Sequence, residues 1–146
     1  MPIVRYLVSR GARIDGRDRK GGTPLTQAAM EGHLTVMKAL VSHCADDPIS
    51  RRHLCVDIDA SDHLFTTSLM WAARRGSLAM VKFLVSEGAD ISLTDAKHKT
   101  AIDIARMHHY DRITAYLSRA LKREKALKRM KRKMEMMMCA LPFSAG

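Results

Sequence analysis

The sequence predicts an all-α protein in which stacked helical hairpins form a solenoid and a basic amphipathic helix follows at the carboxyl end. Three observations predict this architecture. A short segment recurs along the chain, a second segment recurs in the same phase, and a run rich in Lys, Arg and Met follows the last copy. Because a repeated unit of this size cannot bury its apolar face alone, neighbouring units have to stack.

Length and composition are consistent with one domain that has a core. The chain has 146 residues, of which 47% are hydrophobic. Charges interrupt every apolar run before it reaches the roughly 18 to 20 residues that a bilayer requires, and residues 1–10 lack the apolar block of a signal peptide. Three unclustered cysteines suit a reducing compartment. We therefore expect an intracellular protein of the cytoplasm, the nucleus or both.

The first recurring segment predicts a short helix that ends in a tight turn. Its copies span residues 23–34, 67–78 and 100–111, separated by steps of 44 and then 33 residues. Each copy begins with a threonine suited to cap a helix. The first two carry a pair of alanines, small enough for a neighbouring helix to approach closely. Gly32 and Gly76 then allow the chain to turn back.

The second recurring segment predicts the return helix of each hairpin. It spans residues 7–12, 40–45 and 84–89, and each copy begins with Leu-Val-Ser. Apolar residues recur around it at helical spacing. They are Val36, Met37, Leu40 and Val41 in one copy and Met80, Val81, Leu84 and Val85 in the next.

Together these segments follow the pattern D-x-x-G-x-T-P-L-x-x-A-A-x-x-G-H and then an apolar helix ending in G-A-D. This pattern resembles the ankyrin repeat, whose period is the 33-residue step found here. The resemblance covers residues 1–118. It implies a half repeat at 1–15, a repeat at 16–45, an inserted loop at 46–56, a repeat at 57–90, a degenerate terminal repeat at 91–118 and a basic tail at 119–146.

The chain also departs from the pattern. It opens in mid-repeat, so we expect it to be a fragment or an isoform of a longer protein. Thr26, Met70 and Asp103 replace the family's usual histidine, and His109 stands where the third copy should have glycine. The inserted loop at 46–56 is expected at the surface, either as part of a binding face or as a tolerated excursion.

The resemblance implies binding through the turn tips and the inner helix face. We expect contacts from Arg19, Lys20, Met30, His63, Leu64, Trp71, Arg74, Arg75, Lys97, Lys99 and His108. Neighbouring positions of the same kind are Gly22, Gln27, Glu31, Thr66, Ala96 and Met107. With Glu31 as the single acid, the set favours an acidic protein partner, unless it is a solvated face with excess charge. Trp71 is either a contact residue or packs against Leu64 or Met107.

The tail predicts a basic amphipathic helix. Residues 119–135 hold nine Lys or Arg and two Glu, so they carry +7 of the chain's net charge of +10. Its cations include Lys122, Arg123, Lys125, Lys128, Arg129, Lys131, Arg132 and Lys133. One face carries Ala126, Leu127, Met130, Met134, Met137, Met138 and Leu141. Four interpretations stay open: a solvated helix capping the stack, a nuclear-import or nucleic-acid patch, a calmodulin-type ligand, and a helix on an anionic membrane.

No motif indicates catalysis. The sequence has no phosphate-binding loop, nucleophile elbow or paired C-x-x-C, so we expect neither an enzyme nor a cofactor. His43, Cys44, His53 and Cys55 match no common zinc spacing, and no metal site is predicted. We expect a monomeric scaffold or adaptor that binds protein. The alternative is a nuclear or nucleic-acid-associated regulator that uses the tail, and a regulatory piece of a longer enzyme is a third possibility.

Overall fold

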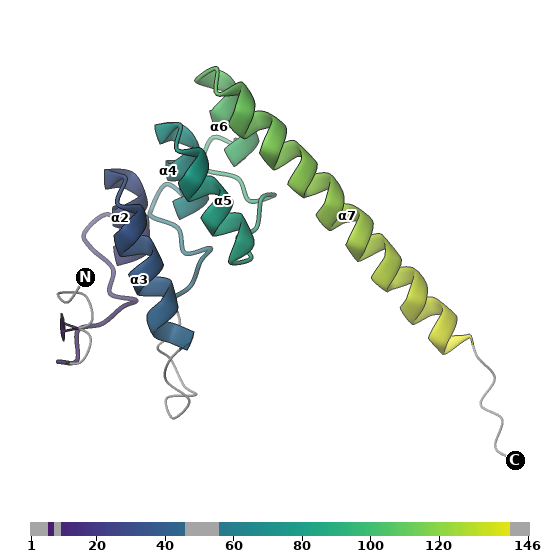
Figure 1. Cartoon of the computed structure of the whole chain (residues 1–146), viewed down its shortest axis with the longest axis horizontal. Helices are drawn as coiled ribbons and strands as arrows, with labels where there is room; N and C mark the ends of the chain where they lie inside the picture. The colour runs from purple at the N-terminus through teal and green to yellow at the C-terminus, as the bar shows by residue number, and fades with distance from the viewer. Residues whose placement is uncertain (1–5, 8–9, 46–55, 141–146) are drawn as a thin grey trace, which may run out of the picture.

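The computed structural model describes residues 6–7, 10–45 and 56–140, with the side chains of residues 43–45 also outside the description. Its helices are α2 (Pro24–Glu31), α3 (Leu34–Ala45), α4 (Ser68–Arg75), α5 (Leu78–Ser86), α6 (Ala101–Met107) and α7 (Asp111–Cys139). They form successive antiparallel pairs that lie side by side (Figure 1). The predicted all-α solenoid of helical hairpins is confirmed.

The first helix of each pair begins at a threonine. Thr23 Oγ1 accepts a hydrogen bond from the backbone N–H of Thr26 at 3.3 Å, and Thr67 and Thr100 accept the equivalent bonds at the start of α4 and α6. At α6 the Asp103 carboxylate also accepts from the backbone N–H of Thr100 at 3.0 Å. Each cap satisfies a backbone donor that the helix itself leaves unpaired.

The turns between paired helices use the left-handed backbone region. Gly32 has φ 85° and Gly76 has φ 73°, as the sequence pattern requires. His109 occupies the equivalent position after α6 and adopts φ 59°. The turn therefore forms there without glycine, and the histidine Cβ adds strain that the other two turns avoid.

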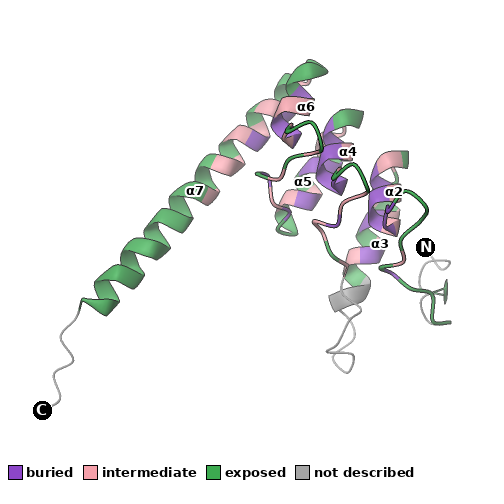
Figure 2. Ribbon diagram, turned by 180° about the vertical axis from the view of Figure 1, so that it is seen from behind, coloured by how far each residue is buried: buried purple, intermediate pink, exposed green. Residues whose placement is uncertain are grey.

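Small residues set the distance between repeats. α2 packs against α4, and α4 packs against α6. Ala29, Ala72, Ala73 and Ala105 are fully buried at these contacts, where Figure 2 shows a continuous buried layer through the pairs. Larger side chains, including Leu25, Met37, Leu69, Val81 and Leu84, fill the rest of the core.

Helix α7 has a packed part and a free part. Ile113 and Leu117 are buried against the last repeat, and Leu121 also packs against the core. From Lys125 to Ala140 every residue is exposed. Figure 1 shows this part extending away from the repeats. The tail helix is therefore confirmed, and it is continuous across residue 118, where the sequence repeat ends.

Some predicted segments lie partly or wholly outside the described residues. Of the half repeat at 1–15, the structure describes residues 6–7 and 10–15. The Leu7 side chain is 51% exposed there. The inserted loop is described only at Val56. Among the helices in the described ranges, none is apolar over enough of its length to cross a bilayer.

A candidate protein-binding groove along the repeat tips

The loops that precede α2, α4 and α6 share one construction. These tip loops span residues 18–22, 62–66 and 95–99. Asp18 begins the first, and its Oδ1 accepts hydrogen bonds from the backbone N–H groups of Lys20 and Gly22, both at 2.8 Å. Asp62 and Asp95 do the same in the second and third loops, at 2.8 and 2.9 Å. The repeated aspartate thus folds each loop locally.

The Asp18 carboxylate is committed to this loop. The backbone N–H of Gly22 is the main cause that lowers the pKa of Asp18, with further help from Lys20 and from the Gln27 side chain. Asp18 therefore stays ionised at neutral pH. The hydrogen bonds stabilise its negative charge, and the charge of the neighbouring Lys20 contributes as well.

Adjacent tip loops are joined by backbone hydrogen bonds. His63 N–H donates to the Lys20 carbonyl, and Ala96 N–H donates to the Leu64 carbonyl, both at 2.9 Å. Arg17 Nη1 donates to the Ser61 carbonyl at 2.7 Å. The tips consequently form one connected row along the edge of the stack.

A hollow of about 320 Å³ lies between the first two tips. It is lined by Arg19, Lys20, Gly22, Thr26, Gln27, Met30, Asp62, His63, Leu64 and Trp71. Trp71 is partly buried and packs against the core, and the Arg74 guanidinium lies 5.4 Å from the centre of its ring. Trp71 therefore packs locally and also lines the hollow together with Leu64.

A second hollow, of about 260 Å³, lies between the second and third tips. It is lined by Thr66, Met70, Arg74, Asp95, Lys97, Lys99, Ile104, Met107 and His108. Lys99 Nζ lies 3.0 Å from Met107 Sδ across it. We call the two hollows together the tip groove.

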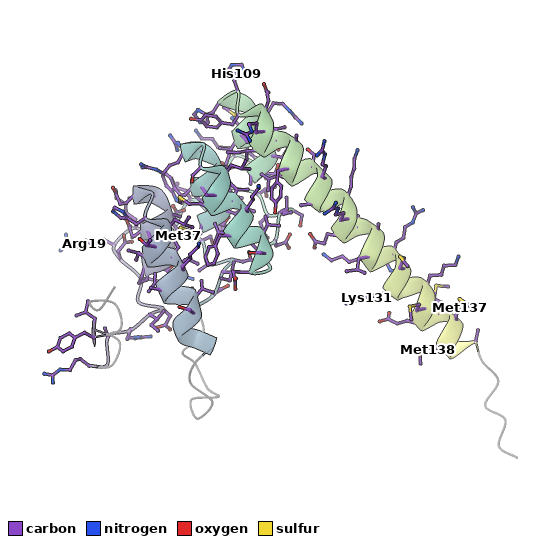
Figure 3. The ribbon with its side chains drawn as sticks, viewed as in Figure 1. Arg19, Met37, His109, Lys131, Met137 and Met138 are labelled. Atoms are coloured by element: carbon purple, nitrogen blue, oxygen red, sulfur yellow. The ribbon has the colours of Figure 1, made fainter. Side chains whose placement is uncertain are left out.

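The tip groove brings together ten of the eleven predicted contact residues. The first hollow contains Arg19, Lys20, Met30, His63, Leu64 and Trp71, and the second contains Arg74, Lys97, Lys99 and His108. Figure 3 shows Arg19 pointing away from the stack. Arg75 lines neither hollow: its Nη1 donates to the Met30 carbonyl at 2.6 Å, so it ties α4 to α2 instead.

Two acids of the hollows were not among the predicted positions. Glu31 was expected to be the single acid, but it lines neither hollow, whereas Asp62 and Asp95 each line one. Both were recognisable as the aspartate that begins each tip. Their Oδ1 atoms accept two backbone donors each, which stabilises the ionised carboxylates and holds them in the tip loops.

Phe65 is an exposed aromatic residue outside the set of predicted contacts. It is 62% exposed beside Leu64, which is 65% exposed, and it adopts φ 57°. Phe65 occupies the loop position of Gly21, which has φ 78°. Phe65 lines neither hollow, and His98 has the same φ of 57° at the equivalent position of the third loop, so this backbone conformation recurs with the repeat.

The predicted tail cations all lie on α7. Lys122 and Arg123 are exposed beside the packed part, and the free part carries Lys125, Lys128, Arg129, Lys131, Arg132 and Lys133. Lys128 Nζ contacts Glu124 Oε1 at 2.6 Å, and this hydrogen bond raises the pKa of Lys128. Within the described ranges, no three His, Cys, Asp or Glu side chains gather as a metal site would require. The side chains of His43, Cys44, His53 and Cys55 lie outside the description.

Comparisons with known families agree with this geometry. A model described as ankyrin repeats in many copies matches residues 1–41, and one described as ankyrin repeats in three copies matches residues 49–128. No curated protein matches the chain. Ankyrin repeats are generally protein–protein interaction modules and are typically not enzymes. On the phased hairpins, the threonine-capped helices and these matches, the chain belongs to the ankyrin-repeat family.

Proposed function

We propose that this protein is a scaffold or adaptor module that binds a protein partner along the tip groove. The observation that carries the proposal is Trp71, which lines the first hollow with Met30 and Leu64 while its other contacts hold it against the core. A ring fixed in this way loses little conformational freedom when a partner covers it. Trp and Arg side chains in such pockets contribute disproportionately to binding.

Charge around the hollows favours an acidic partner. Arg19 and Lys20 border the first hollow, and Lys97 and Lys99 border the second. The two hollows together are lined by five Lys or Arg side chains and by two Asp, so cations outnumber carboxylates around an approaching chain. An acidic segment carrying an apolar side chain for the first hollow fits this arrangement.

A capture experiment with paired variants tests the proposal. The full chain, a Trp71→Ala/Arg74→Glu variant and a Lys38→Glu variant are immobilised, and captured proteins are identified by mass spectrometry. Lys38 is an exposed residue of α3, away from the tips, so its reversal controls for lost charge. We expect partners that the wild type and Lys38→Glu retain and the double variant loses. Retention of every partner by the double variant would contradict the proposal.

A second candidate function uses the tail. The exposed cations of residues 125–133 favour a nuclear or nucleic-acid-associated regulator, which is consistent with a protein of the cytoplasm or nucleus. Binding to DNA or RNA would then fall steeply with salt. Truncation at Leu121 should abolish that binding and nuclear accumulation, and unchanged behaviour of the truncated chain would remove this candidate.

A further inference from the structure

The free part of α7 is an isolated helix that solvent reaches from every side. All residues from Lys125 to Ala140 are exposed, which corresponds to a rod of about 24 Å. Figure 3 shows Lys131, Met137 and Met138 on it, beyond the paired helices. A partner is therefore able to enclose this helix rather than only touch one side.

The free part has an apolar stripe of large exposed side chains. The stripe consists of Leu127, Met130, Met134, Met137 and Met138, which are between 55% and 70% exposed. The side chains of Lys125, Arg129, Arg132 and Lys133 follow the opposite face in the sequence. A stripe of this size is unusual on a helix that stands in water.

The apolar stripe only partly continues the face that packs against the repeats. At 100° per residue, Leu127, Met134 and Met138 follow the line of Tyr116 and Ala120, which pack against the core at one edge of that face. Met130 and Met137 lie beyond that edge. The described repeats leave all five side chains of the stripe exposed, so the whole stripe is available to an occupant.

Three kinds of binding partner would each fit only part of the surface of this helix. A nucleic acid would neutralise the cations but leave the methionines in water. A second copy would pair two segments that each carry +7 over residues 119–135, and like charges at close range oppose association. A membrane would cover one side of the helix only.

We propose that the free part of α7 is a ligand for an acidic protein whose methionine-rich groove closes around a helix, as calcium-loaded EF-hand proteins do. The cations meet the acidic rim, and the apolar stripe fills the groove. Thioether side chains are flexible and polarizable, so two methionine-rich surfaces adapt to each other. This binding uses a different surface from the tip groove and goes beyond the function proposed above.

Two methionines provide a matched pair for the test. Met134 lies in the apolar stripe and is 61% exposed, whereas Met136 lies two residues away among the cations and is 68% exposed. Met134→Gln and Met136→Gln make the same chemical change on opposite faces without altering charge. A Leu127→Gln/Met134→Gln variant enlarges the expected effect.

The probe is calcium-loaded calmodulin, titrated into the full chain by calorimetry. We expect a one-to-one complex that EDTA dissociates, that Met134→Gln weakens by about tenfold and that Met136→Gln leaves nearly unchanged. Trp71→Ala should also leave it unchanged, so that this proposal and the tip-groove proposal can fail separately. Circular dichroism checks that each variant keeps its helix.

Several outcomes would overturn the proposal. One is no binding of the wild type to calcium-loaded calmodulin, and another is equal weakening by both glutamine variants, which would indicate attraction by charge alone. Binding to phosphatidylserine–phosphatidylcholine vesicles or duplex RNA with no calmodulin complex would assign the free part of α7 to a membrane or a nucleic acid. Concentration-dependent dimerisation that Met134→Gln abolishes would assign it to a second copy.

Discussion

The guanidinium of Arg75 in α4 donates a hydrogen bond to the backbone carbonyl of Met30 at the end of α2, with 2.6 Å between Nη1 and O. A Cβ on Gly32, in the turn after α2, would lie 2.9 Å from Arg75 Nε. Arg75 therefore covers the turn of the preceding repeat and satisfies a carbonyl at a helix end, where the helix supplies no partner.

Replacing Arg75 should weaken the contact between these repeats. Arg75→Ala is expected to lower the free energy of unfolding by about 0.5–1.5 kcal/mol, measured by urea denaturation. Arg119→Ala, at an exposed position of α7, is the control for loss of an arginine. Equal stability of both variants would show that the bond to Met30 contributes nothing in solution.

His109 carries strain that glycine would relieve. Because its φ of 59° matches the turn in which the other repeats use glycine, His109→Gly should raise the free energy of unfolding by about 0.5–1 kcal/mol. His108 has φ −95° and its ring stacks on Tyr110, so His108→Gly should lower it. Thermal denaturation of the two variants measures the difference, and a lower melting temperature for His109→Gly would contradict the prediction.

Gly76 and Gly88 separate backbone strain from steric overlap. Both have positive φ, but an added Cβ at Gly88 meets nothing within 4 Å, whereas at Gly76 it would lie 2.6 Å from the Tyr110 ring. We expect Gly88→Ala to cost about 1 kcal/mol and Gly76→Ala to cost about 1–3 kcal/mol more. Equal costs in chemical denaturation would mean that the Tyr110 ring moves aside freely.

Acid should destabilise the protein through carboxylates that act as acceptors. Hydrogen bonds from Thr100 lower the pKa of Asp103, and those from Ser92 lower the pKa of Asp90. Each ionised carboxylate stabilises the folded state above the ordinary pKa of 3.8. This stabilisation is lost as the pH falls through the lowered pKa that the carboxyl group has in the folded state. The stability of Asp103→Asn should accordingly decline less steeply with acid than that of the wild type.

Asp59 should have the opposite effect. Burial raises its pKa above 3.8, although the Asp90 backbone N–H donates to it at 2.9 Å. A raised carboxyl pKa means that the folded state gains protons first, so Asp59 supports stability as pH falls. Asp59→Asn should therefore make the acid decline steeper. Urea titrations between pH 5 and 3 compare both variants, and a shallower decline for Asp59→Asn would contradict the assignment.

The sequence predicted most of the fold because the repeat imposes local rules. Thr67 and Gly76 define a helix start and a turn by their own side chain and backbone, and the phased alanines identify the face that packs. Positions in the tip groove were also predictable, since their phase within the repeat is the same in each copy. Arg75 lines neither hollow because its side chain turns to the Met30 carbonyl, and phase does not reveal which way a long side chain turns.

By itself the sequence determined which residues form helices, where the hairpins turn, and that cations cluster at the tips and in the tail, because caps, turn residues and apolar spacing act over a few residues. The tertiary structure alone decided which tips meet to form a hollow, that Asp62 and Asp95 line it, and where α7 leaves the stack. Those features depend on contacts between residues 31 to 45 positions apart, such as Asp90 with Asp59 and Arg75 with Met30. Their geometry exists only once neighbouring repeats have packed.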